Sequence, residues 1–509
     1  MAFCGVDVGG TFTDVVLVDE DGGDLRVAKV RSSHPTPEHG VLAGVEQAAE
    51  GMSFAELTYF VHGTTVGLNA IIEGKGPALA MLCTRGFRDV LEMRRSNQTE
   101  DPYNLLWQPR PPLIPRARRL PVGGRISASG EVLTPLSEED VEVALGEIRA
   151  SGAAGIIVAF INAYVNPEHE IEVERLLRAA GFEGDVTLSH RVSREHREYE
   201  RTSTAVVNGY IRPYVSDYLA RLSDGLAERK FVGTSFITRS GGGALTFAEG
   251  EERPFETLLS GPVAGVEGAA YLGRRLGREQ IITADVGGTS FDTALILDGR
   301  PIVKQEGEIA GQPLQTPWVD VRSIGAGGGS IATVDAGGLL RVGPRSAGSD
   351  PGPAAYGRGG TEPTVTDAAV ILGLFPMRDL SGAVDLDAEL AERALEPLAQ
   401  TLGLDVVDVA AGILRIAGSH MADAIREITV ECGEDPRTAV LVPFGGAGPL
   451  FATQLADELG ITEIVVPPFA GVFSAWGLLV TDAVQARSRT QLMPLDEAAR
   501  PALDASLGD

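Results

Sequence analysis

The sequence has few of the residues that mark secreted, membrane or nucleic-acid-binding proteins. Its three cysteines, Cys4, Cys83 and Cys432, are scattered and form no Cys-x-x-Cys pair, which argues against a disulfide framework or a thiolate zinc site. No apolar run approaches the length of a membrane span. Lys and Arg number 43 against 70 Asp and Glu, and the net charge of −27 repels nucleic acids and anionic membranes. We therefore predict a cytoplasmic protein that binds neither nucleic acid nor membrane.

Two common nucleotide-binding motifs are also missing. The sequence contains no Gly-x-x-x-x-Gly-Lys-Ser/Thr, so it is not a P-loop protein. It has no Gly-x-Gly-x-x-Gly between a strand and a helix either. The closest segment is 325–330, where Ser330 occupies the position of the last glycine. A dinucleotide cofactor is therefore disfavoured.

An acidic octad with a central glycine pair occurs twice. It reads Asp-Val-Gly-Gly-Thr-Phe-Thr-Asp at residues 7–14 and Asp-Val-Gly-Gly-Thr-Ser-Phe-Asp at residues 285–292. Each copy lies between two β-type runs, so we predict two hairpin tips, the first tip (7–14) and the second tip (285–292). Glycine pairs let the backbone approach phosphates, threonine adds a hydroxyl, and aspartates are oxygen ligands for Mg²⁺. Two such tips facing each other would bind a magnesium triphosphate.

The repeat suggests a chemical role for each of its residues. Asp7, Asp14, Asp285 and Asp292 are predicted as magnesium ligands, and Asp7 and Asp285 also as catalytic residues. The predicted nucleotide-binding residues are glycines and hydroxyl residues of the tips and of two further glycine-rich segments: Gly9, Gly10, Thr11, Thr13, Gly287, Gly288, Thr289, Ser290, Gly327, Gly328, Gly445, Gly446 and Gly448. The last three form a predicted strand-to-helix turn, where a helix N-terminus can approach a nucleotide. For the glycines at 327–329, close packing of backbone is the alternative role.

The candidates outside the repeat have less distinctive surroundings. His62, Thr64 and Thr65 follow a short predicted strand, and we predict that they bind substrate. A lone histidine is more often a structural residue, which is the alternative for His62. Asp320 lies upstream of the glycine run and is predicted as a general base, with a structural role as its alternative. These assignments depend on whether the fold brings the residues to the tips.

The spacing of the repeat predicts the fold class, an internally duplicated α/β protein. Two copies of one hairpin core, separated by about half the chain, imply similar halves with a cleft between them. Helices are predicted at 37–49, 66–72, 136–151, 167–180, 387–402, 406–429 and 450–459, and strands at 59–62, 79–83, 155–160, 301–304 and 439–442. A further long helical stretch at 193–226 is expected to end its first half near Pro213.

The chain is predicted to divide into three parts. Residues 1–190 form an N-terminal domain that contains the first tip and a proline-rich, loop-rich insertion at 85–130. Residues 191–495 form a main domain that contains the second tip, and residues 496–509 form a tail. Within the first part, the alternation of strand and helix predicts a βαβ unit with a parallel sheet.

The motifs together resemble one known family. They occur at 7–14, 62–65, 260–262, 285–290, 324–330, 343–348 and 445–450. Their order is similar to that in the A subunit of the hydantoinase/oxoprolinase family, and the resemblance covers nearly the whole chain. It implies two RNase-H-like halves around a nucleotide cleft, as in the actin, hexokinase and Hsp70 ATPases.

The resemblance also implies an activity. Family members use ATP and Mg²⁺ to phosphorylate a cyclic amide, such as a hydantoin or 5-oxoproline, and so allow water to open the ring. A B-type subunit is expected to hydrolyse the phosphorylated intermediate, which makes a partner chain another expectation.

Two differences from the family keep other functions open. Family members usually have a further C-terminal domain after residues 471–479, and Phe451 occupies the position of a family histidine. One alternative is a subunit of an ATP-dependent ketone carboxylase of the acetone or acetophenone type. Another is a non-catalytic, actin-like nucleotide-binding scaffold, which both differences favour.

Overall fold

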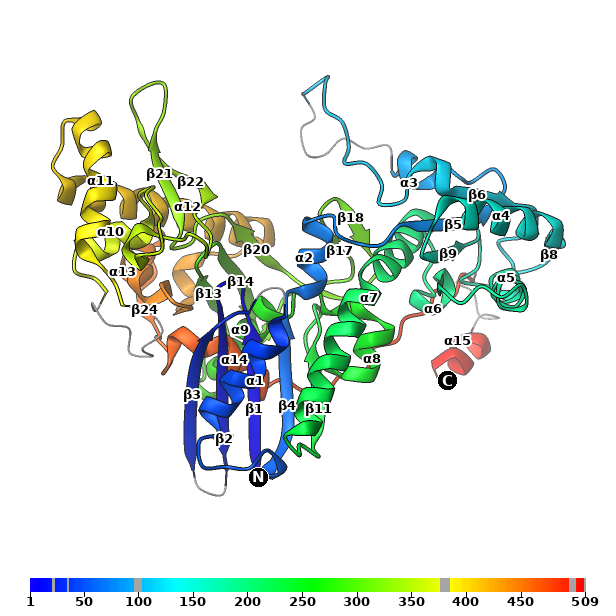
Figure 1. Ribbon diagram of the computed structural model, residues 1–509, viewed down its shortest axis with the longest axis horizontal. Coiled ribbons are helices and arrows are strands. Elements are labelled where there is room, and N and C mark those ends of the chain that lie inside the picture. The colour runs from blue at the N-terminus through cyan, green and yellow to red at the C-terminus, as the bar shows by residue number, and fades with distance from the viewer. Residues whose placement is uncertain (21–22, 34–35, 96–102, 376–384, 494–499, 508–509) are drawn as a thin grey trace. The chain divides into compact units, whose positions relative to one another are not determined.

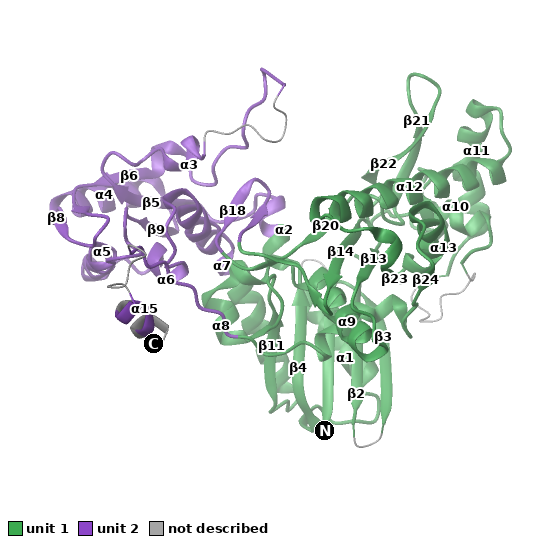
Figure 2. Cartoon of the chain, turned by 180° about the vertical axis from the view of Figure 1, so that it is seen from behind, with its two compact units in different colours: residues 1–69, 214–305, 316–484 green, residues 70–213, 306–315, 485–509 purple. Residues whose placement is uncertain are grey.

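The chain forms two compact units, each assembled from separate segments (Figure 2). Unit 1 comprises 1–69, 214–305 and 316–484, and unit 2 comprises 70–213, 306–315 and 485–509. The computed structural model describes residues 1–20, 23–33, 36–95, 103–375, 385–493 and 500–507. Within these ranges no helix has both the length and the apolar character needed to cross a membrane.

The first half of unit 1 is built on a six-stranded sheet. Its strands are β1 (Ala2–Val8), β2 (Phe12–Asp19), β3 (Asp24–Arg31), β4 (Leu57–Thr64), β11 (Thr234–Thr238) and β12 (Ala244–Thr246). They lie in the order β12-β11-β4-β1-β2-β3, and β1, β2 and β3 form an antiparallel meander (Figure 1). The strands β4 and β11 run parallel to β1. The sequence Glu-Asp-Gly-Gly-Asp at 20–24 predicts a turn between β2 and β3, and its residues 21 and 22 lie outside the described residues.

The second half of unit 1 repeats this arrangement. Its sheet contains β13 (Ile281–Val286), β14 (Phe291–Leu297), β15 (Arg300–Pro301), β20 (Val321–Ile324), β23 (Val440–Phe444) and β24 (Glu463–Ile464). An antiparallel hairpin of β13 and β14 is again followed by strands parallel to its first member, β23 and then β24. The predicted duplicated α/β fold with two RNase-H-like halves is therefore confirmed.

The third strand of the second meander differs from the prediction. Instead of one strand over 301–304, the chain forms the short β15 and then β16 (Val303–Lys304), which pairs with β19 (Trp318–Val319). β15 pairs with the end of β14, and β20 pairs with residues 291–294 of the same strand. Pro301 has no N–H to donate to the sheet, which limits the length of the strand that contains it.

Unit 1 contains helices that pack on its two sheets and on one another. They are α1 (Pro37–Ala48), α2 (Val66–Ile72), α8 (Phe247–Glu252), α9 (Ser260–Leu276), α10 (Val365–Ile371), α11 (Ala388–Leu402), α12 (Val406–Cys432), α13 (Gly448–Leu459) and α14 (Phe473–Leu479). A second hairpin, β21 (Ser330–Val334) with β22 (Leu340–Ser346), follows the glycine run. In the first half α1 packs on β2 and β3, and in the second α12 packs on α10 and α13 around a large hydrophobic core. The helix α2 extends three residues past the boundary into unit 2.

The helices α9 and α14 pack against each other and against both sheets. α9 contacts β4 and β11 of the first sheet and β13 and β14 of the second, while α14 contacts β1 and β2. A Cβ atom on Gly477 of α14 would overlap the carbonyl oxygen of Ala264 in α9. A Cβ atom on Gly5 of β1 would overlap the carbonyl oxygen of Ala475 in α14. Backbone therefore lies directly on backbone where the two halves of unit 1 meet.

Unit 2 contains a parallel four-stranded sheet. Its strands, β5 (Leu79–Thr84), β6 (Arg119–Val122), β9 (Gly155–Ala159) and β10 (Asp185–Leu188), lie in the order β10-β9-β5-β6. The helices are α3 (Val90–Met93), α4 (Glu138–Ser151), α5 (Glu168–Ala179), α6 (Ser189–Val192) and α15 (Arg500–Leu507), and two hairpins are β7 (Arg125–Ile126) with β8 (Val132–Thr134) and β17 (Gly307–Ile309) with β18 (Gln312–Leu314). The predicted βαβ unit is confirmed by β9, α5 and β10.

Two sequence predictions for this part of the chain need correction. The region 85–130, predicted as a loop-rich insertion, also contains β6, which forms an edge of the sheet. Pro121 argues against a strand at this place in the sequence, but an edge strand tolerates a proline. The long helix α7 (Glu198–Glu228) continues through Pro213 without a break in its assigned span, and the boundary between the units falls directly after that residue. Of the predicted tail, the structure describes only 500–507, which form α15.

The contact between α9 and α14 leads to a first prediction. Gly477→Ala is expected to destabilise the protein by about 2 kcal/mol or more, because the added methyl group overlaps backbone that cannot move independently. Gly146→Ala is the matched control, since Gly146 lies inside α4 with open space around it, and this change is expected to stabilise by about 0.5–1 kcal/mol. Thermal unfolding of both variants measures the difference. Equal stability of the two variants would contradict the close contact.

Candidate functional site

Both octads form hairpin tips with the same turn. In the first tip the N–H of Gly9 donates to the carbonyl of Phe12, and in the second the N–H of Gly287 donates to the carbonyl of Ser290, each at 3.0 Å. Asp7 lies directly opposite Asp14 in the first hairpin, as Asp285 lies opposite Asp292 in the second. Each tip therefore has one acidic residue on each of its two strands.

The two tips meet within unit 1. A Cβ atom on Gly288 would lie 3.4 Å from the hydroxyl oxygen of Thr11, which is van der Waals contact between the two turns. The charges of Asp7 and Asp14 are also close enough to Asp285 to raise its pKa. Gly10, Gly288 and Thr289 are exposed at this junction. Glycines and threonines from opposite halves of the fold thus lie side by side.

Asp7 is buried among glycines and has an unsatisfied oxygen. Its Oδ1 atom has no hydrogen-bond partner, and Cβ atoms on Gly63 and Gly261 would lie 3.1 and 3.0 Å from it. Burial, and then the charge of Asp14, raise the pKa of Asp7 from 3.8 to about 7, while the charge of Lys29 lowers it. A buried carboxylate without donors is costly unless a cation or a hydrogen-bond donor compensates it.

Asp285 occupies the equivalent place in the second half. A Cβ atom on Gly445 would overlap its Oδ1 atom. Burial raises the pKa of Asp285 well above 3.8, and the charges of Asp292, Asp7 and Asp14 add to this effect. Gly63 lies near the end of β4 and Gly445 follows β23, each strand being the parallel neighbour of the one that bears the aspartate. The duplication therefore gives both acidic residues a glycine as neighbour.

The other two acidic residues of the tips have partners. Asp14 Oδ1 accepts a hydrogen bond from Lys29 Nζ at 2.6 Å, and the same ammonium group donates to the carbonyl of Gly471 at 3.1 Å. Asp292 Oδ2 accepts a hydrogen bond from the Ser290 hydroxyl at 2.8 Å, and burial raises the pKa of Asp292. Asp7 and Asp285 are thus the two aspartates whose buried oxygens lie against glycine.

Lys29 is a residue of the site that was not predicted from the sequence. Its position follows from the register of the first meander, which pairs Asp14 with Lys29 and Asp19 with Asp24 across the turn between β2 and β3. Counting back from the acidic, glycine-containing turn would have placed this lysine opposite Asp14. Ser32 was also missed: its hydroxyl donates to the carbonyl of Gly9 at 2.6 Å, and its N–H donates to that of Thr11 at 3.1 Å.

The residues at the tips fit a hydrated magnesium ion. Asp7 and Asp285 offer buried oxygen ligands with raised pKa values, and a divalent cation would favour their ionised forms. Among the described residues no group of three or more His, Cys, Asp or Glu is arranged to hold a metal ion by itself. Mg²⁺ is commonly held by one or two carboxylates together with phosphate oxygens and water, so two carboxylates are sufficient for it.

The glycine run at 327–329 supports the second tip. The N–H groups of Gly328 and Gly329 donate to the carbonyls of Gly287 and Gly288 at 3.0 and 2.6 Å. A Cβ atom on Gly327 would lie 2.7 Å from the backbone nitrogen of Ser290. These glycines bring one backbone segment onto another, which is the close-packing alternative stated for them above, and the N–H of Gly328 is already used.

The predicted strand-to-helix turn lies between β23 and α13. Gly445 has a φ angle of +82°, Gly446 is exposed, and a Cβ atom on Gly448 would lie 2.9 Å from the carbonyl oxygen of Ala284. The turn therefore requires glycine at its first position and has open space at its second. Phe451, one turn into α13, is 1% exposed and belongs to the hydrophobic core of the second half.

His62 has a structural environment. Its Nδ1 atom is 3.1 Å from the carbonyl oxygen of Val6, and its Nε2 atom is 2.6 Å from the hydroxyl of Tyr218. The first contact requires a proton on Nδ1, so Nε2 accepts from the tyrosine. Burial lowers the pKa of His62 from 6.5 to about 4, and the ring is neutral at pH 7. Both nitrogens are occupied within the protein.

The neighbouring threonines lie between β4 and α2. The backbone N–H of Thr64 donates to the Ser260 hydroxyl, which in turn donates to the Thr64 carbonyl. Thr65 accepts from the side chain of Asn69 at 3.3 Å. Thr13 of the first tip is fully buried, 3.2 Å from the Ser32 hydroxyl. Thr64 and Thr13 thus stabilise the backbone around the first tip.

Asp320 is not brought to the tips. It lies between β19 and β20, is 7% exposed, and forms an ion pair of 2.8 Å with Lys304. The register of β20 on β14 places Ser323 opposite Asp292, so Asp320 is three residues, about 10 Å, further along the strand. The ion pair agrees with the structural alternative for this residue.

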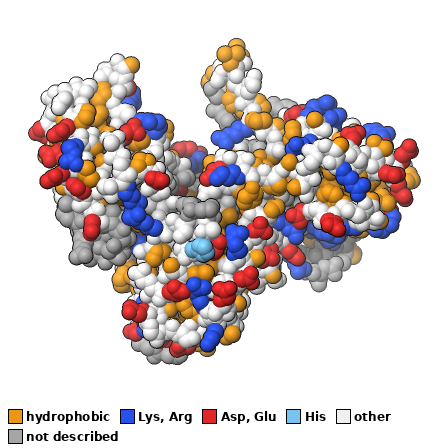
Figure 3. Space-filling model, viewed as in Figure 1, with side chains coloured by type: hydrophobic (Ala, Val, Ile, Leu, Met, Phe, Trp, Pro, Cys, Tyr) orange, Lys and Arg blue, Asp and Glu red, His pale blue; other side chains and the backbone are white. Residues whose placement is uncertain are grey.

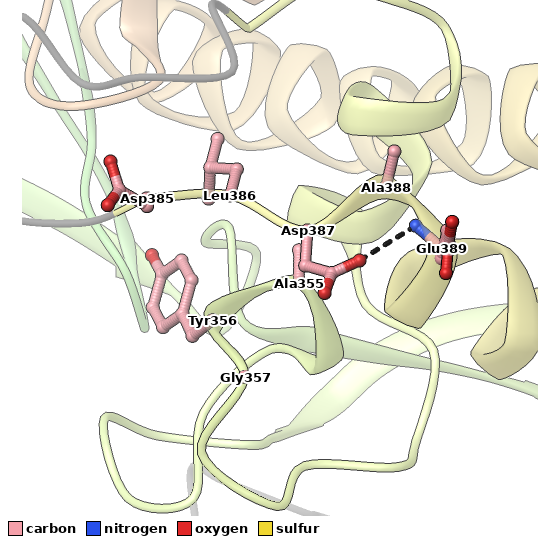
Figure 4. Close-up of a pocket in the computed structure, with 8 residues that line it drawn as sticks. All are labelled: Ala355, Tyr356, Gly357, Asp385, Leu386, Asp387, Ala388 and Glu389. Atoms are coloured by element: carbon pink, nitrogen blue, oxygen red, sulfur yellow. Dashed lines mark hydrogen bonds between the residues drawn. The ribbon is translucent and has the colours of Figure 1, made fainter.

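A surface hollow of about 630 Å³ lies where α11 begins (Figure 4). Its lining includes Tyr356, Asp387 and Glu389. The Asp387 carboxylate accepts hydrogen bonds from the backbone N–H groups of Glu389 and Leu390, as a helix N-cap does. The Asp387 carboxylate in this hollow is therefore used in forming the helix.

Comparison with known sequences assigns the chain to a family. The sequence model described as hydantoinase/oxoprolinase matches residues 201–487, and the model of the hydantoinase/oxoprolinase N-terminal region matches residues 3–181. The chain belongs to the hydantoinase/oxoprolinase family. The family predicted from the order of the motifs is confirmed.

Similar proteins include both hydrolases and carboxylases. The chain is 36% identical to the caprolactamase subunit alpha of Pseudomonas jessenii, over 97% of this chain and 72% of that protein. It is 37% identical to the acetophenone carboxylase gamma subunit of Aromatoleum aromaticum, over 96% and 69%. The solved structure of a nucleotide-free, ATP-dependent acetone carboxylase superposes with a TM-score of 0.83 at 32% identity, covering 94% of this chain and 69% of that one. These relatives confirm the predicted class of enzyme, which is ATP-dependent and includes hydrolases of cyclic amides.

The raised pKa of Asp7 leads to a prediction about stability. Below pH 4 the carboxyl is protonated in both folded and unfolded states; between about pH 4 and 7 it ionises only when unfolded, so the folded state loses stability as pH rises. Asp7→Asn removes this loss and is expected to raise the free energy of unfolding at pH 8, without metal or nucleotide, by at least about 1.4 kcal/mol, the equivalent of one pKa unit.

Thermal unfolding across pH 4 to 8 measures this effect. Asp217→Asn is the control, because Asp217 is exposed on α7. If Asp7→Asn is no more stable than the control at pH 8, the inference that an uncompensated carboxylate at the first tip destabilises the folded protein is wrong.

The environment of His62 predicts the opposite pH dependence. Because its pKa is lowered to about 4, protonation favours the unfolded state, and stability is lost as pH falls from about 6.5 to 4. His62→Gln is expected to lower stability at pH 7.5 by about 1–3 kcal/mol through the lost hydrogen bonds and to flatten this pH dependence. His420→Gln, at an exposed position of α12, is the control. Unchanged stability with a raised KM for substrate would instead assign His62 to the substrate site.

Proposed function

We propose that this chain is the ATP-using subunit of an enzyme that hydrolyses a cyclic amide of the hydantoin or 5-oxoproline type. One observation carries the proposal: two acidic glycine tips, from duplicated halves of one unit, meet with Asp7 and Asp285 buried at the junction. Membership of the hydantoinase/oxoprolinase family supplies the class of reaction.

The chemistry follows from the poor reactivity of an amide. The amide oxygen attacks the terminal phosphorus of ATP, the bond to ADP breaks, and the amide carbon becomes electrophilic. Water adds to this carbon, the ring carbon–nitrogen bond breaks as the nitrogen takes a proton, and a second water releases phosphate from the acyl phosphate. Little of this requires covalent chemistry by the protein, so positioning and charge stabilisation supply most of the acceleration.

The residues of the tips have distinct roles in this proposal. The exposed backbone at Gly10, Gly288 and Thr289, with the Thr11 hydroxyl, holds the phosphates. Gly446 lines the adenosine side, where its position has open space. Bound Mg²⁺ neutralises phosphate charge and favours the in-line geometry of phosphoryl transfer.

Four aspartates would hold this ion at different ranges. Asp7 and Asp285 would orient it directly or through its water, since Asp7 has a buried oxygen without a hydrogen-bond partner and both carboxyls have raised pKa values. Asp14 and Asp292 act at longer range, because Lys29 and Ser290 already occupy one oxygen of each. Asp14 and Asp292 therefore adjust the charge of the site more than they coordinate.

A second subunit is part of the proposal. Relatives are named as subunits, including the alpha subunit of a caprolactamase and the gamma subunit of a carboxylase. In unit 2 a loop carries Tyr103, Leu105 and Leu106, which are 94%, 98% and 88% exposed. Hydrophobic side chains gather at the end of such a projecting loop in Figure 3, whereas charged groups of both signs are interspersed elsewhere on that face. Exposed apolar side chains of this kind support a B-type partner chain.

A cytoplasmic location stays a prediction.

ATP turnover with defined substrates tests the proposal. Full-length protein, alone and with a B-type subunit, is expected to hydrolyse ATP faster when 5-oxoproline, hydantoin or a lactam is added. Asp285→Asn is expected to reduce this turnover by about 100-fold or more, because it removes a charge from the phosphoryl-transfer site. Asp217→Asn, the exposed control, is expected to retain it.

The alternatives give different results in the same assay. Stimulation by a ketone with bicarbonate, and not by cyclic amides, would assign the chain to the carboxylases. Magnesium-dependent ATP binding without turnover on any of these substrates would assign it to non-catalytic scaffolds. Wild-type activity of Asp285→Asn would exclude the tips as the catalytic site.

A further inference from the structure

The junction of the tips has a deficit of positive charge. Four aspartates meet there, and the lysine beside them, Lys29, is paired with Asp14 at 2.6 Å. A nucleotide triphosphate carries several negative charges, of which one divalent cation neutralises two. Sites that transfer phosphoryl groups usually add arginine or lysine to the metal ion. A phosphoryl-transfer site at this junction would therefore use further cationic groups near the tips.

Arg31 lies beside the first tip. It is the last residue of β3 and pairs across the sheet with Phe12. The next residue, Ser32, is bonded to the carbonyls of Gly9 and Thr11. This fixes the backbone of Arg31 against the turn of the first tip.

Arg358 is connected to the second tip through a chain of hydrogen bonds. The N–H of Gly329 donates to the carbonyl of Gly288 in the tip, and the carbonyl of Gly329 accepts from the N–H of Ala347. Gly329 therefore links the segment that begins at Ala347 to the tip. Arg358 Nη1 then donates to the carbonyl of Ser349 at 3.4 Å. The guanidinium also lies over the ring of Tyr356, 5.4 Å from its centre.

The guanidinium of Arg358 is incompletely satisfied. Its Nη2 atom is buried and has no hydrogen-bond partner. Burial, and then the nearby charge of Arg31, lower the pKa of Arg358, while Tyr356 and Asp350 raise it. The charge of Arg31 is thus close enough to act on Arg358, although like charges repel. A buried donor without an acceptor is costly, and native proteins often keep such a donor where an ion or ligand binds.

We propose that Arg31 and Arg358 form a cationic pair that binds the terminal phosphates of the nucleotide. The pair rests on the proposed function, and it assigns to this chain the groups that stabilise the transferred phosphoryl group. Arginine suits this task because its planar fork donates two parallel hydrogen bonds to phosphate oxygens. The single long hydrogen bond to Ser349 leaves Arg358 free to turn toward an anion at little cost.

Binding of nucleotides with different numbers of phosphates tests the pair. Arg31→Gln and Arg358→Gln are each expected to weaken Mg²⁺-ATP binding by about 10-fold or more, the value of a hydrogen bond between charged groups. AMP binding is expected to stay within about twofold, because AMP has no β- or γ-phosphate. Arg345→Gln is the matched control, since Arg345 pairs with Glu362 at 2.8 Å in the same region. Calorimetry on the full-length chain measures all three ligands, with ADP as the intermediate case.

The outcomes separate this inference from the proposed function. If wild type binds Mg²⁺-ATP, Asp285→Asn impairs its turnover and both arginine variants match Arg345→Gln, the cationic pair is wrong and the proposed function stands. Equal weakening of ATP and AMP binding would also overturn the pair, because the effect would not follow the phosphates. If wild type does not bind Mg²⁺-ATP, both fail. A thermal unfolding midpoint close to that of wild type for each variant shows that a loss of binding is not a loss of fold.

Discussion

The backbone contact between α9 and α14 is the constraint on which the rest of unit 1 depends. Each half of the duplicated fold has its own sheet and core, and what joins them is a helix pair that touches both sheets. Gly5 and Gly477 allow this contact, because any side chain there would overlap a carbonyl oxygen. Because the two sheets are held by this helix pair, the hairpin tips at 7–14 and 285–292 have little freedom to move relative to each other. The meeting of Thr11 with Gly288 therefore depends on this helix packing, and α9 also reaches the first tip through Gly261.

That packing has an electrostatic consequence. It buries Asp7 and Asp285 close together with few donors, so the carboxyl pKa values rise and the folded state bears a cost. Folded proteins retain such costs mainly at functional sites. Here a cation would relieve the cost at the carboxylates, and an anion would relieve it at Arg358. A magnesium triphosphate would supply both the cation and the anion, which accounts for a carboxylate oxygen without a donor and an arginine nitrogen without an acceptor in the same unit.

The sequence was sufficient for local features whose residues have one physical role. A glycine pair between β-type runs specifies a hairpin tip, and glycines between a predicted strand and a predicted helix specify the turn at Gly445. Side-chain environments were not predictable, because they depend on contacts between distant segments. His62 illustrates this, since Val6 and Tyr218 occupy both its nitrogens. Asp320 and the glycine run at 327–329 also acquired their structural roles through long-range pairing.

By itself the sequence determined the family, the duplication and the chemistry available at the two tips, because these are properties of short motifs and their order. Only the tertiary structure decided which of the four aspartates have hydrogen-bond partners and which carboxyls have raised pKa values. Lys29 reaches Asp14 across a sheet, and Gly261 closes over Asp7 from a helix more than two hundred residues away in the chain. Burial and charge proximity are sums over all neighbours, and most neighbours of a buried residue are remote in sequence.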